Sequence, residues 1–238
     1  MKGNQDPALI RRWKIVTPTS SKRGEVLKRC FKELFLDLKE PGINIWMIPF
    51  VSIGFVVCSY YLQNELKENN TVTLALLEVL IPFLGGYASI MIMQSVLDTE
   101  GCEILFSYPR SALYWGIIRQ LRLFVIYSLF SSLICKCIAA IMCIPFFSLC
   151  VLTLAQSFTV MAIGFLGVCA SRKVSIGLIT LIAFVGIQIM LGREIAPLNW
   201  IYVLSGRFPE NSAIVSICIR SVLIGIFGWI TGQLWIHP

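Results

Sequence analysis

The feature that most constrains this chain is the stretch from Leu123 to Ala170, which has 48 residues and a single formal charge, on Lys136. An α-helix rises about 1.5 Å per residue, so about 20 apolar residues span the hydrocarbon core of a bilayer. The stretch therefore has the length of two membrane crossings. Pro145 lacks a backbone N–H and restricts the residue before it, so it marks the expected hairpin between the two.

Composition extends this interpretation to the whole chain, which has 238 residues, 57% of them hydrophobic and 14% charged. Soluble domains carry about 25% charged residues, so an ordinary soluble protein is excluded. The apolar runs predict an all-α, multi-pass domain over residues 43–238 with six transmembrane helices. The predicted spans are residues 43–62, 73–97, 119–143, 147–170, 174–192 and 213–235, with residues 171–173 as a tight connection before the fifth. Gly228 and Gly232 form a G-x-x-x-G motif, which favours close helix packing and is compatible with a dimer face.

Residues 1–42 are predicted to form a basic cytoplasmic tail followed by an amphipathic helix. Apolar residues recur at helical spacing on one face, while charged residues fill the other, and Pro41-Gly42 ends the pattern. The apolar positions are Leu27, Phe31, Leu34, Phe35 and Leu38. This pattern is typical of a helix that lies on the inner membrane surface. A helix that packs against a partner protein remains the alternative.

The distribution of basic residues predicts the orientation. With the N-terminus inside, the cytoplasmic segments hold fifteen Lys and Arg residues, against three in the outer loops, Lys67, Arg193 and Arg207. By the positive-inside rule both termini are then cytoplasmic, and the chain is expected in the cell membrane, that of a bacterium. The net charge of +7 is interpreted as this topological bias, and no nucleic-acid partner is expected.

Groups that could support catalysis are scarce, so no enzymatic activity and no catalytic residue are expected on this chain. The only histidine is His237, and the sequence contains no G-x-x-x-x-G-K-[ST] nucleotide-binding motif. Cys135 and Cys137 could suggest a soft metal site. Alternate residues on a helix point about 200° apart, however, so these thiols are interpreted as ordinary apolar side chains and no metal site is expected.

Three ionisable residues within the predicted spans form a candidate site, namely Glu78, Lys136 and Arg220. Each charge at a helix centre costs about 3 kcal/mol unless it is paired or hydrated. All three are predicted within roughly 12 Å of the outer face, at the helical rise per residue. One hypothesis is an intramembrane cluster that binds an anionic head group or a peptide carboxylate. The other is that Lys136 and Arg220 extend to the outer head groups, with Glu78 at the boundary.

The most distinctive segment, residues 98–120, lies between the second and third predicted spans. It begins with three acids, continues with apolar residues and a Ser-Tyr-Pro-Arg turn, and enters the third span. Large apolar residues beside the membrane indicate a docking surface. The residues that carry this pattern are Glu100, Glu103, Ile104, Leu105, Phe106, Tyr108, Pro109 and Arg110.

This arrangement resembles the type-2 ATP-binding-cassette permease family, the transmembrane subunits of bacterial exporters. That family places an acidic start, a short apolar helix and a proline turn between the second and third of six spans. It also has an interfacial helix before the first span, matched by residues 23–40, and a partly re-entrant outer segment, for which residues 193–212 are the candidate. The chain has Arg119 where the family often has a lysine.

The resemblance implies a permease subunit of an exporter for a hydrophobic or amphipathic substrate, such as a lipid-linked molecule, a peptide or a drug. The partners would be a second permease, identical or different, membrane lipid, and a separate ATPase subunit that binds ATP and Mg. The residues at 100–110 would couple the permease to that ATPase. The alternative is a membrane protein that only binds a partner, such as an immunity or assembly factor.

Overall fold

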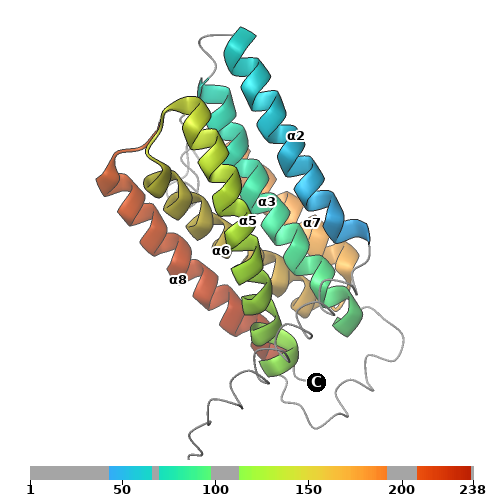
Figure 1. The fold of residues 1–238 in the computed structure, drawn as a ribbon. Coiled ribbons are helices and arrows are strands. Elements are labelled where there is room, and N and C mark those ends of the chain that lie inside the picture. Colours follow the sequence, from blue (N-terminus) through green and yellow to red (C-terminus); the bar gives the residue numbers. More distant parts are fainter. Residues whose placement is uncertain (1–42, 66–69, 98–112, 192–207, 237–238) are drawn as a thin grey trace, which may run out of the picture. The chain divides into compact units, whose positions relative to one another are not determined.

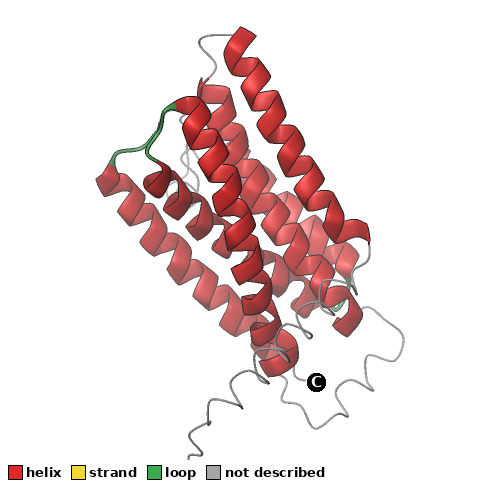
Figure 2. Cartoon of the chain, in the orientation of Figure 1, coloured by secondary structure: helices red, strands yellow, loops and turns green. Residues whose placement is uncertain are grey.

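The computed structural model describes residues 43–65, 70–97, 113–191 and 208–236, all within one compact unit, Asp37–Pro238. Every regular element in these ranges is helical, which confirms the predicted all-α class (Figure 2). The helices are α2 (Ile43–Glu65), α3 (Asn70–Leu97), a π-helical turn η2 (Tyr114–Ile118) that continues into α5 (Arg119–Met142), α6 (Phe146–Ser171), α7 (Val174–Leu191) and α8 (Asn211–Ile236) (Figure 1).

Four of these helices are long and apolar enough to cross a membrane. They are Val72–Gln94, Tyr114–Met142, Phe146–Ser171 and Asn211–Ile236, the shortest of which has 23 residues. The apolar helical segments at the other two predicted spans are shorter, Met47–Tyr61 and Val174–Met190. The third span begins at Tyr114, five residues before the predicted start. The predicted interfacial helix and most of residues 193–212 lie outside the described residues.

Helix α6 is the centre of the bundle and contacts α3, α5, α7 and α8. Two thirds of the most apolar stretch of α6 is buried inside the bundle, as in α3. In α5 and α8 only one third of the corresponding stretch is buried. Residues in contact show that α3 and α8 both run parallel to α6. Along α3 the pairs are Glu78 with Gln156 and Ser89 with Met161. Along α8 they are Ser221 with Thr159 and Gly228 with Ala162. We call the two ends of the bundle the Pro145 end and the Arg172 end, after the turns that join α6 to α5 and to α7.

Small residues bring the central helices into close contact. A Cβ atom added to Gly164 would lie 2.8 Å from the backbone oxygen of Gly86, so α3 and α6 touch backbone to backbone. A Cβ at Gly232 would lie 2.7 Å from Phe165, and one at Gly228 would lie 3.2 Å from Ala162. The G-x-x-x-G motif of α8 therefore packs against α6 of the same chain, which confirms close helix packing and assigns these two glycines to an internal contact rather than a dimer face.

Both predicted turns are present. Pro145 is the N-cap of α6, directly after a turn in which Cys143 ends α5 with a φ of 54°. Arg172 ends α6 with a φ of 56°, and α7 begins at Val174. A left-handed residue reverses the chain within two or three positions, so each hairpin is tight and its two helices are antiparallel.

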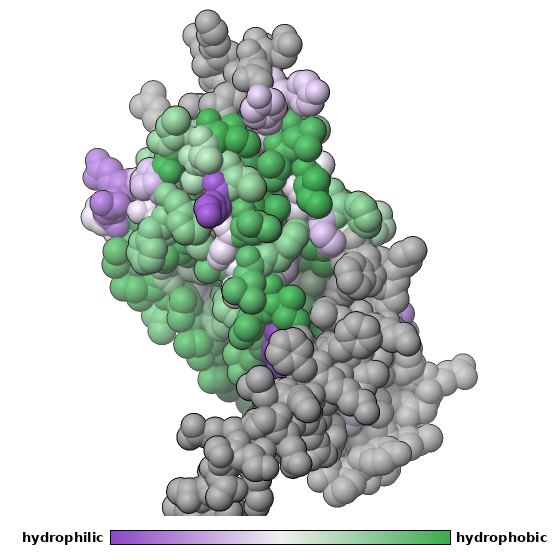
Figure 3. All heavy atoms as spheres, viewed as in Figure 1, coloured by the Kyte–Doolittle hydropathy of each residue, from purple (hydrophilic) through white to green (hydrophobic). Residues whose placement is uncertain are grey.

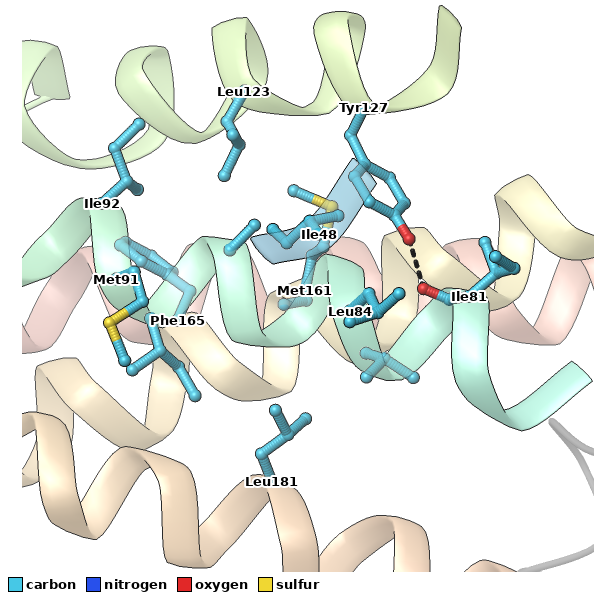
Figure 4. Packing of buried hydrophobic residues seen from close by; sticks show 14 of the residues in the cluster. Ile48, Ile81, Leu84, Met91, Ile92, Leu123, Tyr127, Met161, Phe165 and Leu181 are labelled. Carbon is cyan, nitrogen blue, oxygen red and sulfur yellow. Dashed lines mark hydrogen bonds between the residues drawn. The ribbon is translucent and has the colours of Figure 1, made fainter. Parts of the chain in front are cut away.

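Over the described residues, the face of the bundle in the space-filling view is largely apolar (Figure 3). Large side chains are widely exposed on several helices, for example Leu129 at 71%, Met190 at 83% and Phe227 at 71%. Inside, residues such as Met161, Phe165 and Leu181 are fully buried and interlock between α3, α5, α6 and α7 (Figure 4). A surface this apolar is suited to lipid rather than water, so the described helices have the character of a membrane protein.

Candidate functional site

Polar residues inside the bundle gather on and around α6. This helix buries Thr153, Gln156, Ser157 and Thr159, all at most 1% exposed. A buried polar group in an apolar medium costs several kcal/mol unless it is hydrogen-bonded, so its partners are a guide to structure and function. The hydroxyl of Thr159 lies 2.6 Å from the carbonyl oxygen of Ser221, which bonds α6 to α8.

The predicted acid Glu78 has a described partner on α6. The amide Nε2 of Gln156 donates to Glu78 Oε1 at 2.8 Å, and Gln156 is fully buried. A hydrogen bond to a carboxylate is stronger than one between neutral groups. The bond from Gln156 therefore stabilises the Glu78 side chain in its position between the helices. The carboxylate and the amide therefore form a polar pair between α3 and α6, in the half nearer the Pro145 end.

The two basic residues of the predicted cluster are both exposed. Lys136 is exposed on α5, whose buried face carries Ile134, Cys135 and Ile138. Arg220 is exposed on α8, next to the buried Ser221. Their exposure is the placement that the head-group hypothesis requires. Convergence of all three on one cavity stays a prediction.

The two cysteines that suggested a metal site point to different sides of α5. Cys135 is fully buried and Cys137 is exposed. Their placement agrees with the helical spacing argument that they do not face one ion together.

A second polar junction joins α3, α5 and α6 nearer the Arg172 end. The hydroxyl of Ser89 lies 2.8 Å from Gln120 Oε1 and 2.9 Å from the carbonyl oxygen of Met161, so its one proton is shared between two acceptors. Gln120 returns a bond from Nε2 to the Ser89 carbonyl oxygen at 3.1 Å. Ser89 and Gln120 are both fully buried. The junction fixes the register of three helices.

The π-helical turn η2 forms a third junction, with α8. The backbone N–H of Ile117 donates to Gln233 Oε1 at 2.9 Å. Gly116 makes room for this amide, because a Cβ there would lie 2.0 Å from Gln233 Oε1. Single π turns are uncommon and are found frequently at functional sites. This one begins at Tyr114, four residues after Arg110, the last residue of the predicted docking pattern.

The η2 junction can be tested with Gly116→Ala. The added methyl group displaces the Gln233 side chain and breaks its bond to Ile117, so we expect a loss of about 1 kcal/mol in unfolding free energy. Thermal unfolding of the purified protein in detergent measures it. The control is Gly54→Ala, where nothing lies within 4 Å of the added atom. Equal stability of the two variants would show that the junction is energetically unimportant.

Aromatic side chains bridge α5, α6 and α8 beside these junctions. Phe158 packs on Trp229 with ring centroids 4.6 Å apart, and Phe124 lies 5.2 Å from Phe158. Gly225 leaves space for the Phe158 ring, since a Cβ there would come within 2.4 Å of it. The contact holds α5 and α8 on the same side of α6.

Three glutamines that the sequence pattern did not single out take part in four of the described hydrogen bonds between helices. Gln120, Gln156 and Gln233 carry no formal charge, so they did not stand out among the ionisable residues. Each is at most 7% exposed. Their position inside apolar runs is the signal that would have found them, because an amide in lipid requires a partner.

The predicted coupling residues, Glu100, Glu103, Ile104, Leu105, Phe106, Tyr108, Pro109 and Arg110, lie outside the described residues. Arg119, in contrast, lies within α5 and is only 2% exposed. No protein-family model, no curated protein and no solved structure matches this chain. The function must therefore be inferred from the residues and their geometry.

Proposed function

We propose that this chain is the transmembrane permease subunit of an ATP-driven exporter of the type-2 ATP-binding-cassette kind. In this proposal all six helices cross the cell membrane, with the Arg172 end on the cytoplasmic side. A second permease, identical or different, would complete the pathway. A separate ATPase subunit would bind ATP and Mg, because this sequence has no nucleotide-binding motif of its own.

The observation that carries the proposal is the anchoring of both helices that flank residues 98–112. On one side, Ser89 of α3 is bonded to Gln120 and to the α6 backbone. On the other side, η2 is bonded to α8 through Gln233. A displacement of the flanking segments would therefore be transmitted to α3, α5, α6 and α8 together. Transporters that are driven by an external ATPase require such a connection.

The interior also suits an amphipathic substrate. The described helices offer a largely apolar interior with one carboxylate–amide pair, Glu78 with Gln156, toward the end opposite the coupling segment. Such a pair would contact the polar part of a substrate, while the apolar residues around it would contact the remainder. A lipid-linked molecule, an amphipathic peptide and a hydrophobic drug all fit this description.

The first experiment is purification of the tagged protein in mild detergent, followed by mass spectrometry and an ATPase assay. We expect a stoichiometric subunit with a P-loop and vanadate-sensitive ATP hydrolysis. Recovery with a partner that lacks a nucleotide site would contradict the proposal and favour a membrane protein that only binds a partner.

The coupling segment is tested by the double variant Glu103→Ala with Phe106→Ala. Loss of the acid and the apolar contact should reduce the number of molecules transported per ATP hydrolysed by roughly tenfold, while the protein remains folded. This factor lies within the usual range of coupling between two sites. Transport into inverted vesicles and ATP hydrolysis are measured together. The matched control is Glu210→Ala with Phe147→Ala, both exposed at the Pro145 end. Unchanged coupling in the first variant would refute the role of this segment.

A further inference from the structure

Helix α3 is packed differently in its two halves, which meet at Pro82. In the first half, residues 72–81, three of the ten residues are buried. They are spaced four positions apart, at Thr73, Leu77 and Ile81. Residues four apart lie on one face of a helix, so the bundle holds this half along a single stripe. In residues 82–93 ten of the twelve are buried, so the second half is enclosed on nearly all sides.

The second half of α3 is clamped directly after the proline. A Cβ atom added to Gly85 would lie 3.0 Å from the ring of Tyr127 in α5. One added to Gly86 would lie 2.7 Å from Leu181 in α7 and 2.9 Å from Val160 in α6. Three helices therefore contact α3 closely within about one turn, and the second half cannot shift without displacing them.

Pro82 weakens the helix at the boundary between the halves. Proline has no backbone N–H, so the usual helical bond from residue 82 to the carbonyl oxygen of Glu78 cannot form, and proline rings favour a bend. The hydroxyl of Tyr127 donates instead to the carbonyl oxygen of Ile81, the residue before the proline (Figure 4). This bond ties the end of the first half to α5, while the bond from Gln156 to Glu78 ties it to α6.

We propose that Pro82 is a hinge, at which the first half of α3 bends away from the bundle while the second half stays in place. The bond from Tyr127 to Ile81 holds the first half in the closed position that the structure shows. Bending would separate Glu78 from Gln156 and admit water or a polar ligand to this pair from the Pro145 end. The inference follows from the packing of one helix, so it does not depend on ATP-driven transport.

Chemical modification of Glu78 measures this opening in the full-length protein in detergent. A water-soluble carbodiimide activates carboxyl groups that water reaches, and glycine ethyl ester then traps them as amides. Mass spectrometry of peptides gives the rate at Glu78. The exposed Glu210 is the internal reference for the activity of the reagent.

Two variants should change the rate at Glu78 in opposite directions. Tyr127→Phe removes the bond to Ile81, so we expect the rate to rise about fivefold, the effect of one ordinary hydrogen bond. Pro82→Ala restores the backbone N–H, so the rate should fall several-fold. The matched controls lie in α2, Tyr60→Phe at an exposed tyrosine and Pro49→Ala at a helix-internal proline. Each control should change the rate less than about twofold.

An unchanged rate at Glu78 in both Tyr127→Phe and Pro82→Ala would overturn the hinge. So would a higher rate in Tyr127→Phe that is accompanied by faster hydrogen exchange in residues 86–97, because the whole bundle would then be loosened. Faster exchange in residues 70–81 alone would support the proposal. Size-exclusion profiles identify a variant that does not fold, and the other variant then decides the result.

Discussion

Replacing Gly164 by valine is expected to destabilise the bundle by about 3 kcal/mol, the upper end of the usual range for overpacking. The added Cβ would lie 2.8 Å from the carbonyl oxygen of Gly86 and 3.1 Å from Ile90. A backbone oxygen cannot rotate away as a side chain can, so α3 and α6 must separate. Separation also weakens the Glu78–Gln156 and Ser89–Met161 contacts between the same helices.

Thermal or denaturant unfolding in detergent measures this effect. Gly164→Ala should lose less unfolding free energy than Gly164→Val, because alanine adds the Cβ atom without the two methyl groups that valine carries on it. The control is Gly186→Ala in α7, where nothing lies within 4 Å of the new atom. A helix gains about 0.5–1 kcal/mol from Gly to Ala at an open position, so this variant should be slightly more stable than the parent. Similar behaviour of Gly164→Val and Gly186→Ala would show that α3 and α6 are not in contact here.

Replacing Gln156 by leucine is expected to cost about 2 kcal/mol of unfolding free energy. The variant keeps the volume but removes the Nε2 donor 2.8 Å from the carboxylate of Glu78. Loss of a hydrogen bond to a charged group in a protein interior has a cost of about 1.5–3 kcal/mol. The double variant Glu78→Gln with Gln156→Leu should lose less than the sum of the single losses, because the two residues interact.

A matched control is available in α7. Gln188 is 2% exposed, and its Oε1 has no hydrogen-bond partner among the described residues. Gln188→Leu removes an unsatisfied oxygen, so it should be neutral or stabilising. If Gln156→Leu is equally harmless, the Glu78–Gln156 pair contributes nothing to stability, and its assignment to the substrate pathway would lose its structural support.

The position of most helices could be predicted from the sequence because bilayer thickness imposes a length on apolar runs. Proline and short polar links interrupt helices, so Pro145 and residues 171–173 predicted the two ends of α6. The structure places turns at both positions. The third apolar helix begins at Tyr114 with η2, five residues before the predicted start at residue 119. The sequence pattern placed Arg119 and Gln120 at the membrane boundary, where polar residues are common. The structure instead buries both side chains inside the bundle.

The candidate site was predicted only in part, for a physical reason. Formal charge drew attention to Glu78, Lys136 and Arg220, but whether a group faces a neighbour or lipid depends on helix rotation. Apolar residues cover all sides of these helices, so the sequence pattern does not determine that rotation. Uncharged amides such as Gln120 and Gln233 could be assigned partners only after Ser89 and Ile117 were placed beside them.

The central position of α6 has a consequence for biosynthesis. Its polar residues are satisfied partly by α3, made earlier, and partly by α8, whose Ser221 accepts the bond from Thr159 and whose glycines face Ala162 and Phe165. Chains grow at about 5–20 residues per second, so a nascent α6 waits several seconds in the membrane with one face uncovered. Quality control should therefore recognise chains that stop before α8 through this uncovered face, and an insertion chaperone would be most useful during the same interval.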